Sequence, residues 1–240
     1  MNYTENITYL ANYAGSASYA TDPAFLAQLP IFIESAEQRI LRDMDLLSTR
    51  VSETGALTIN QRAFILPNSG GTFNVVETVQ LKMDVNGLLD GTQYTQPALQ
   101  PVSIEFLNAT YPDDHAIGAP SIPEYWAPYR ENQIVVGRAP GQPYPIVIYG
   151  TMDPAPLSVS NTTTFISVNL PDLMLAAEMI LVSAWEKQFS AMADVQGQAR
   201  DWNQEYERLL QAANVQELRR FVESAGWSSW QPNPLNPPIS

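Results

Sequence analysis

The most apolar stretch of the chain is the segment 173–185, in which Glu178 is the only charged residue. Pro171 and Asp172 stand just before it and favour the first turn of a helix, so we predict that a helix begins there. A helix that is apolar on every side must be covered on every side. It is too short to cross a bilayer, which takes roughly 20 apolar residues. Either its own chain or a neighbouring copy must therefore cover it. The expected contacts with a neighbouring copy are Leu173, Leu175, Met179, Ile180 and Trp185.

Two amphipathic segments follow this apolar helix. The first has one apolar stripe at three- and four-residue spacings, formed by Val195, Ala199, Trp202, Tyr206, Leu209 and Ala213. Asn214 is then expected to restart a helix, with Glu217 placed to complete a capping box, and Gly226 is expected to end it. The side chains expected on the inner side of this last helix are Val215, Leu218, Phe221, Val222 and Ala225.

The N-terminal part of the chain also has a helical pattern. A short helix is predicted over residues 4–13, and the pair Asp22-Pro23 is typical of a helix start. Pro30 is expected to break that helix and restart it. The apolar stripe beyond the break consists of Phe32, Ile33, Ala36, Ile40, Met44 and Leu47. The residues expected on the outer face are Glu34, Glu37, Arg39 and Arg42.

From Val51 onward the hydrophobic period changes to that of strands, separated by turn signals such as Asn86-Gly87. The predicted strands cover residues 51–59, 62–66, 75–83, 102–107, 133–136 and 145–149, and residues 111–128 are expected to form a long proline-bearing loop. The predicted fold class is α+β, with a bundle of N- and C-terminal helices and an inserted antiparallel β region. The predicted parts are 1–50 and 169–226 for the helices, 51–168 for the β region and 227–240 for an extended C-terminal arm.

The arm has an unusual composition. Its prolines exclude a helix or a central strand and favour an extended, polyproline-like chain. Two tryptophans on a short extended segment suggest anchors for a groove on another protein, although an undocked tail is the alternative. The residues expected to bind are Trp227, Trp230, Pro232, Pro234, Leu235 and Pro237.

Charge narrows the range of functions. The net charge is −13, and Lys82 and Lys187 are the only lysines, which argues against wrapping nucleic acid. Charged residues make up 15% of the chain, below the roughly 25% of typical soluble proteins, so either other proteins cover much of the surface or uncharged polar residues solvate it. There is no cysteine and no signal-peptide pattern at the start, so we expect a protein made and kept in a reducing cytoplasm.

The chain offers few groups for catalysis. The single histidine, His115, follows Asp113 and Asp114 in the proline-bearing loop, but no second histidine or cysteine completes a usual metal site. No nucleophile-elbow sequence and no phosphate-binding glycine loop is present. We therefore expect no catalytic residue, no metal and no cofactor. The enzymatic alternative is a metal-dependent hydrolase using these three loop residues.

Four segments in a characteristic order carry a resemblance to a known family. They are the amphipathic helix 32–43, the loop 118–127, the strand pair 134–140 and 144–150, and the apolar helix ending at Trp185 together with the helix bearing Trp202, Tyr206 and Leu210. In this order and spacing, across about residues 3–225, they resemble the head–tail connector adaptors of tailed bacteriophages. Residues 84–100 and the Trp–Pro arm depart from the family pattern.

The resemblance implies a non-enzymatic virion protein, made in the bacterial host and located at the head–tail interface. Adaptors of this kind form rings, typically of twelve copies, beneath the portal, and DNA passes through the bore without specific binding. The implied partners are the portal protein, a tail or nozzle protein and further copies of the chain, with no membrane. The resemblance also implies a C-terminal arm that docks on the portal. The structural alternative is another neck or tail-completion protein.

Overall fold

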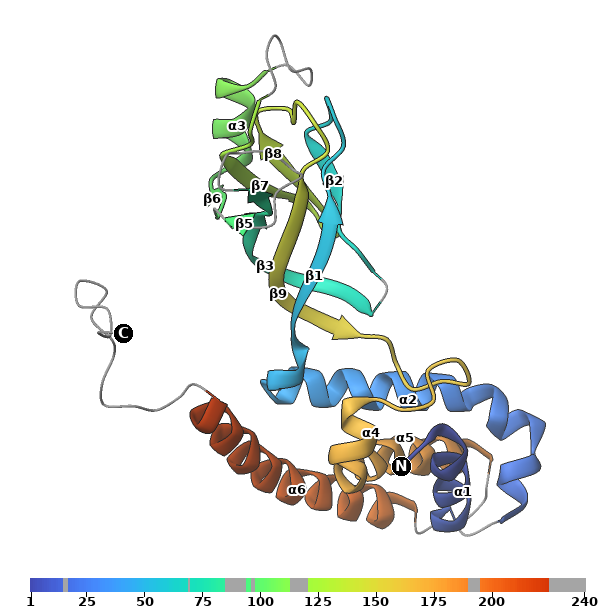
Figure 1. Cartoon of the computed structure of the whole chain (residues 1–240). Coiled ribbons are helices and arrows are strands. Elements are labelled where there is room, and N and C mark those ends of the chain that lie inside the picture. Colours follow the sequence, from blue (N-terminus) through green and yellow to red (C-terminus); the bar gives the residue numbers. More distant parts are fainter. Residues whose placement is uncertain are drawn as a thin grey trace. The chain divides into compact units, whose positions relative to one another are not determined.

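The computed structural model describes residues 1–14, 17–68, 70–84, 94–95, 98–112, 121–189 and 195–224. The chain divides into two compact units (Figure 1). A helical unit combines residues 1–47 with residues 156–240, and a β unit consists of residues 48–155. The α+β class is confirmed, with helices from both ends of the chain packing together and the strands inserted between them. The segment 156–168 belongs to the helical unit, whereas the sequence pattern placed it in the β region.

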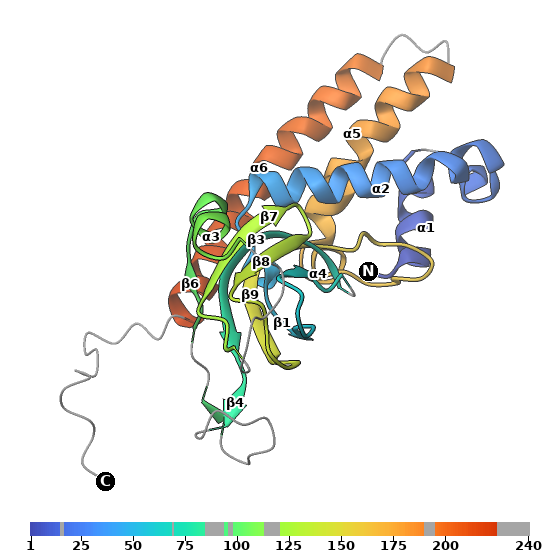
Figure 2. The ribbon, with the colours of Figure 1, turned by 90° about the horizontal axis from the view of Figure 1, so that it is seen from above.

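The helical unit is built around α5, which packs against α1, α2, α4 and α6. Figure 2 shows α5 and α6 running side by side. Asn2 and Glu5 form a capping box at the start of α1, and the Asp22 side chain caps α2, so both predicted starts are confirmed. The helices are α1 (Tyr3–Tyr13), α2 (Pro23–Asp43), α4 (Phe165–Asn169), α5 (Pro171–Phe189) and α6 (Val195–Ser224), with short 3-10 turns η1 (Ala17–Thr21) and η2 (Leu47–Thr49).

Two predicted helix breaks are wrong. Pro30 lies inside the continuous helix α2. Losing one backbone hydrogen bond there is offset by the neighbouring Leu29 and Ile33, which are completely buried on either side of it. Asn214 lies inside α6, which runs unbroken for 30 residues. Side-chain capping signals mark a possible helix start, but they do not force one where the backbone already continues the previous helix.

The β unit contains two larger sheets and one small pair. In the first sheet β9 (Pro145–Pro154) lies between β1 (Arg50–Ala56) and β3 (Gly71–Leu81), antiparallel to both. The second sheet has the order β2 (Ala63–Ile65), β8 (Gln133–Gly137), β7 (Tyr125–Arg130), β6 (Gln100–Pro101). The third pairs β4 (Met83–Asp84) with β5 (Tyr94–Thr95). Residues completely or almost completely buried in the core of this unit include Leu81, Val136, Tyr144, Ile146 and Ile148.

Two predictions in the β unit are wrong. The segment 102–107 was expected to be a strand, but Ser103 accepts a hydrogen bond from the backbone N–H of Phe106 and caps the helix α3 (Ile104–Thr110). The strand β7 lies within the expected loop 111–128 and beyond it. Its antiparallel pairing with β8 supplies the backbone hydrogen bonds of a strand, although the prolines in this segment favoured a loop.

Candidate interaction surfaces

The chain itself covers much of the apolar helix α5. Leu173 and Met179 are only 2% exposed and belong to the core of the helical unit. Leu175, Ile180 and Trp185 are partly buried against that core. Of the five residues expected to meet a neighbouring copy, these last three are therefore the ones that retain exposed surface in the chain alone.

The one charged residue in the apolar run 173–185 of α5 is buried with a polar partner. Glu178 is completely buried, and its Oε1 accepts a hydrogen bond of 2.8 Å from the side-chain amide of Asn6 on α1. Burial raises the pKa of Glu178 to about 8, so the side chain is mostly neutral at pH 7. Within the described part of the chain, Asn6 Oδ1 and Glu178 Oε2 have no hydrogen-bond partner. A neutral carboxyl carries a proton, and placing it on Oε2 converts that atom into a donor.

A second buried carboxylate corrects the prediction for α2. Glu37, expected on the outer face, is almost fully buried. It accepts hydrogen bonds from Thr164 Oγ1 at 2.5 Å and from the backbone N–H of Leu157 at 2.8 Å. Burial raises the pKa of Glu37, although both hydrogen bonds oppose the rise. The spacing contained the signal, because Glu37 follows Ile33 by four residues and precedes Ile40 by three, on the apolar face.

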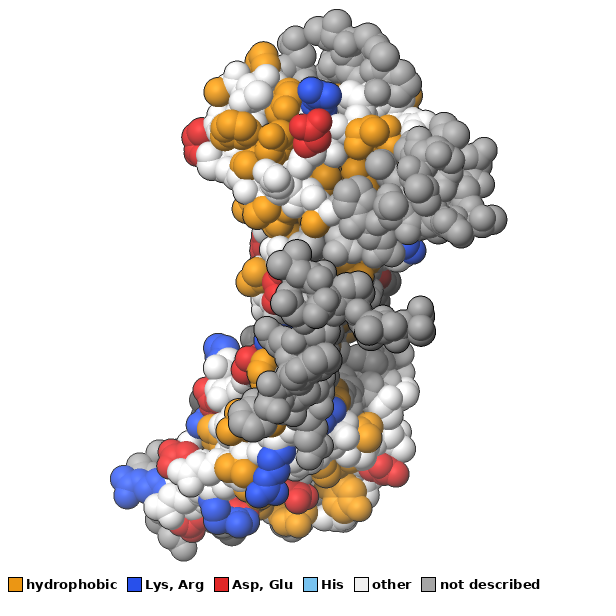
Figure 3. Space-filling model, turned by 60° about the vertical axis from the view of Figure 1, so that its left-hand side comes forward, with side chains coloured by type: hydrophobic (Ala, Val, Ile, Leu, Met, Phe, Trp, Pro, Cys, Tyr) orange, Lys and Arg blue, Asp and Glu red, His pale blue; other side chains and the backbone are white. Residues whose placement is uncertain are grey.

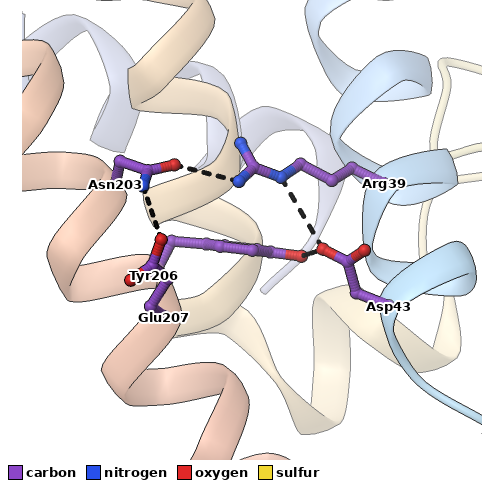
Figure 4. Close-up of polar contacts among 5 residues, drawn as sticks. All are labelled: Arg39, Asp43, Asn203, Tyr206 and Glu207. Carbon is purple, nitrogen blue, oxygen red and sulfur yellow. Dashed lines mark hydrogen bonds and ion pairs between the residues drawn. The ribbon is translucent and has the colours of Figure 1, made fainter.

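Helices α2 and α6 are joined by a polar cluster (Figure 4). The Tyr206 hydroxyl donates to Asp43 Oδ2 at 2.7 Å, and the guanidinium carbon of Arg39 lies 4.2 Å from the centre of the Tyr206 ring. Arg39 also donates to Asn203 Oδ1 at 2.9 Å, and Asn203 donates to Glu207 at 2.8 Å. Burial and the neighbouring Asp43 carboxylate raise the pKa of Tyr206, which therefore stays a hydrogen-bond donor. The cluster fixes the proximal half of α6 on α2.

The distal half of α6 presents apolar side chains to solvent. We call these four residues the α6 stripe: Val215, Leu218, Phe221 and Val222. Their exposed fractions run from 39% to 63%, and their spacing of three and four residues places them on one face of the helix. The prediction that they form the inner side of the last helix is wrong.

The opposite face of the distal half is polar and packs inward. Glu217 is 5% exposed, accepts a hydrogen bond of 3.4 Å from the backbone N–H of Leu47 and pairs with Arg220 at 2.5 Å. The Arg220 guanidinium also lies 4.8 Å from the centre of the Phe165 ring of α4. This half of α6 is therefore inverted relative to an ordinary surface helix, since the charged Glu217 is buried and the apolar stripe faces outward.

The β unit also exposes apolar side chains. Figure 3 shows hydrophobic side chains gathered over this unit, at the top of the view. In this unit Ile65, on the edge strand β2, is 67% exposed, and Tyr129 at the end of β7 is 51% exposed. The other large exposed hydrophobic residues among the described residues of the β unit are Ile59, Val75, Phe106, Ile122 and Tyr149. A surface of this kind suits contact with another protein.

Two sets of predicted residues lie outside the described part of the chain. These are the loop with Asp113, Asp114 and His115, and the arm, with Trp227, Trp230, Pro232, Pro234, Leu235 and Pro237. Among the described residues, no group of three or more His, Cys, Asp or Glu side chains is placed to hold a metal ion. No helix in the described ranges has the length and apolarity needed to cross a membrane.

A comparison with protein-family models finds a match. The family model described as SU10 adaptor protein matches residues 1–235, nearly the whole chain. The match includes both units and all nine strands and six α-helices described above. A comparison with curated proteins finds no match.

Proposed function

Because the chain belongs to the SU10 adaptor protein family, whose members are phage structural adaptors, we propose that it joins the portal to the tail. In this proposal twelve copies form a ring beneath the portal, at the head–tail interface of the virion. A tail or nozzle protein binds the other side of the ring, and DNA passes through the bore. The observation that carries the proposal is the match over residues 1–235, because it includes both units rather than one shared motif.

The charge of the chain supports a bore through which DNA slides. The net charge of −13 and the scarcity of lysine disfavour lasting contacts with phosphates. The protein acts in this scheme through its surfaces rather than through catalysis, which agrees with a structural adaptor family.

Three regions of the chain are assigned a partner in this proposal. The arm 227–240 engages the portal through Trp227 and Trp230. Leu175, Ile180 and Trp185 of α5 contribute to the contact between neighbouring copies, because they keep exposed surface in the single chain. The exposed hydrophobic residues of the β unit contact the next tail component.

The first test is the native mass of the purified protein, alone and mixed with its portal. We expect the mixture to give a complex with a fixed ratio of twelve chains to one portal ring. A chain that never associates with the portal would reject the proposed position and favour another neck or tail-completion role.

The arm is tested with point variants that leave the helical unit intact. Replacing Trp227 and Trp230 together by Ala should weaken portal binding at least a hundredfold, since buried tryptophans dominate many interfaces. The matched control is Asn233→Ala, a polar change in the same arm, which should bind normally. Unchanged binding of the double variant would reject the arm as the portal contact.

The contact between copies is tested on α5. Ile180→Asp should prevent ring formation on the portal, and the control Asn12→Asp introduces the same charge at an exposed position of α1, outside α5. Thermal denaturation must first show that both variants remain folded. If a folded Ile180→Asp protein still formed normal rings, Ile180 would not be part of the contact between copies.

A further inference from the structure

Two carboxyl groups are buried in the helical unit, and their hydrogen-bond partners differ. Both oxygens of Glu37 accept from donors, the Thr164 hydroxyl at 2.5 Å and the backbone N–H of Leu157 at 2.8 Å. This arrangement fits an ionised carboxylate, which can only accept. Glu178 has one donor, the Asn6 amide, at 2.8 Å from Oε1. Its Oε2 and the Asn6 Oδ1 have no partner among the described residues, although both side chains are completely buried.

The two atoms without a partner are both acceptors as long as Glu178 is ionised. Unpaired acceptors in a core are costly, and one proton on Oε2 supplies the missing donor for Asn6 Oδ1. We propose that Glu178 carries this proton, that it forms a doubly hydrogen-bonded acid–amide pair with Asn6, and that the pair is a proton-dependent latch holding α1 on α5. We call the pair the α1 latch. The raised pKa of Glu178, about 8, agrees with a proton held at neutral pH.

The latch lies where a short helix depends on its neighbour. An isolated helix of the length of α1 is marginal in water, and its buried apolar residues are Leu10 and Ala11. When Glu178 loses its proton, a buried carboxylate remains beside the Asn6 amide. Water reaches this carboxylate most readily if α1 opens, because Asn6 belongs to α1. We therefore expect α1 to open locally at alkaline pH while the rest of the helical unit stays folded.

The groups on the other helices packed against α5 leave Glu178 as the centre of this switch. Glu37 of α2 acts on Glu178 by charge repulsion, which adds to the effect of burial on its pKa. The helix α4 has no titratable side chain. On α6 the buried Tyr206 and Glu217 are bonded to side chains other than Glu178. The N-terminal ammonium of Met1 donates to a carbonyl of α4. The remaining titratable groups described on α1, α2 and α6 are at least partly exposed.

Infrared difference spectroscopy on the full chain at pH 7 tests the proton. The carbonyl band of a neutral carboxyl group is separate from the bands of carboxylates, so the wild-type protein should show a band that Glu178→Gln lacks. Asn6→Ala should shift this band to higher frequency, because the carboxyl group loses both hydrogen bonds. The matched control is Asn12→Ala, which removes an exposed amide of α1 and should leave the band in place.

Each outcome of the infrared test decides a part of the proposal. The absence of the band in the wild-type protein would show that Glu178 is ionised and would overturn it. A band that Asn6→Ala leaves unmoved would mean that the proton is not shared with Asn6, and it would overturn the pair.

Hydrogen exchange of the α1 amides, followed by mass spectrometry, tests the latch without changing Asn6. After correction for the intrinsic rates, wild-type α1 should exchange roughly tenfold faster or more at pH 9 than at pH 6. In Glu178→Gln the glutamine amide donates to Asn6 Oδ1 at every pH, so the change should stay below about threefold. The Met1 ammonium is common to both proteins and cancels in the comparison. The amides of β9, in the other unit, serve as the internal control and should not respond.

Equal exchange of α1 in the two proteins at both pH values would overturn the latch. So would an acceleration in the wild-type protein that extends equally over α2 and α5, because it would mean that the whole helical unit opens. Neither experiment involves the portal, so both decide the latch independently of the proposed function.

Discussion

Helices α5 and α6 lie next to each other and use their hydrophobic residues in opposite ways. The run 173–185 of α5 is apolar on every side, and the chain buries much of it, including the Glu178 carboxyl group. The α6 helix is rich in charge, yet its distal half points four apolar side chains into solvent and two charged ones inward. High overall apolarity therefore marks a core helix here. A smaller apolar stripe on a charged helix marks the surface that is open for binding.

The largest effect on stability is expected from a charge placed in the buried part of α5. Val182 is completely buried, so Val182→Asp puts an unpaired carboxylate in the core. We expect a loss of about 3–5 kcal/mol in the free energy of unfolding of the helical unit. Chemical denaturation followed by circular dichroism measures it. A loss below about 1 kcal/mol would mean that this side of α5 is open to solvent.

The buried Glu178 predicts a stability that depends on pH. Its pKa is about 8 in the folded chain and near 4.5 when unfolded, so the folded state holds the proton more tightly. Stability should therefore be highest below about pH 4.5 with respect to this group and should fall as the pH rises toward 8. The loss is about 1.4 kcal/mol per pH unit at most and levels off above that range.

The control for this prediction is Glu178→Gln, measured by chemical denaturation between pH 5 and pH 8. Glutamine cannot ionise, and its amide can donate to the unpaired Asn6 Oδ1, so the variant should lose most of the slope. A smaller slope should remain, because the pKa of Glu37 is also raised. Identical slopes in the two proteins would show that Glu178 is not the group responsible.

The polar cluster that fixes the proximal half of α6 should contribute less. Tyr206→Phe removes the hydrogen bond to Asp43 and keeps the buried ring, so we expect a loss of about 1–2 kcal/mol in the free energy of unfolding. Tyr9→Phe, at a half-exposed position of α1, is the matched control and should change stability by less than about 0.5 kcal/mol. Equal losses for the two variants would show that the cluster does not stabilise the contact between α2 and α6.

The smallest effect on stability is expected on the α6 stripe. Leu218→Asp introduces the same side chain as Val182→Asp, but at a position that is 63% exposed, and should cost less than about 1 kcal/mol. Thermal denaturation of the two aspartate variants side by side sharpens the comparison. A large loss for Leu218→Asp would mean that Leu218 contributes to the folded core in spite of its exposure.

The wrong prediction for the distal half of α6 has a simple cause. If the helix is continuous, the inner face that contains Tyr206, Leu209 and Ala213 continues at the helical period to Glu217 and Arg220. The apolar residues beyond position 214 then fall on the outer face. The predicted break at Asn214 treated the last segment as a separate helix, whose apolar residues could then be placed on the inner side. The helix boundary thus decided which side of the segment faced the core.

Local sequence determined several features of this protein. Three of them depend on neighbours a few residues apart: the caps at Asn2 and Asp22, the continuous apolar run of α5, and the change to strand periodicity after residue 50. The order of motifs along the chain also sufficed to suggest the adaptor family, which the match over residues 1–235 confirms.

Tertiary structure alone decided where the polar groups lie. Glu37 is buried because Thr164 and Leu157, more than 100 residues away, bring hydrogen bonds to it. Glu178 depends in the same way on Asn6. Burying a charged or polar group is tolerable only where partners from other elements satisfy it, and no pattern within one helix reveals those partners. The same reason applies to the distal half of α6. Glu217 and Arg220 face inward there because Leu47 and Phe165, from distant parts of the chain, contact them.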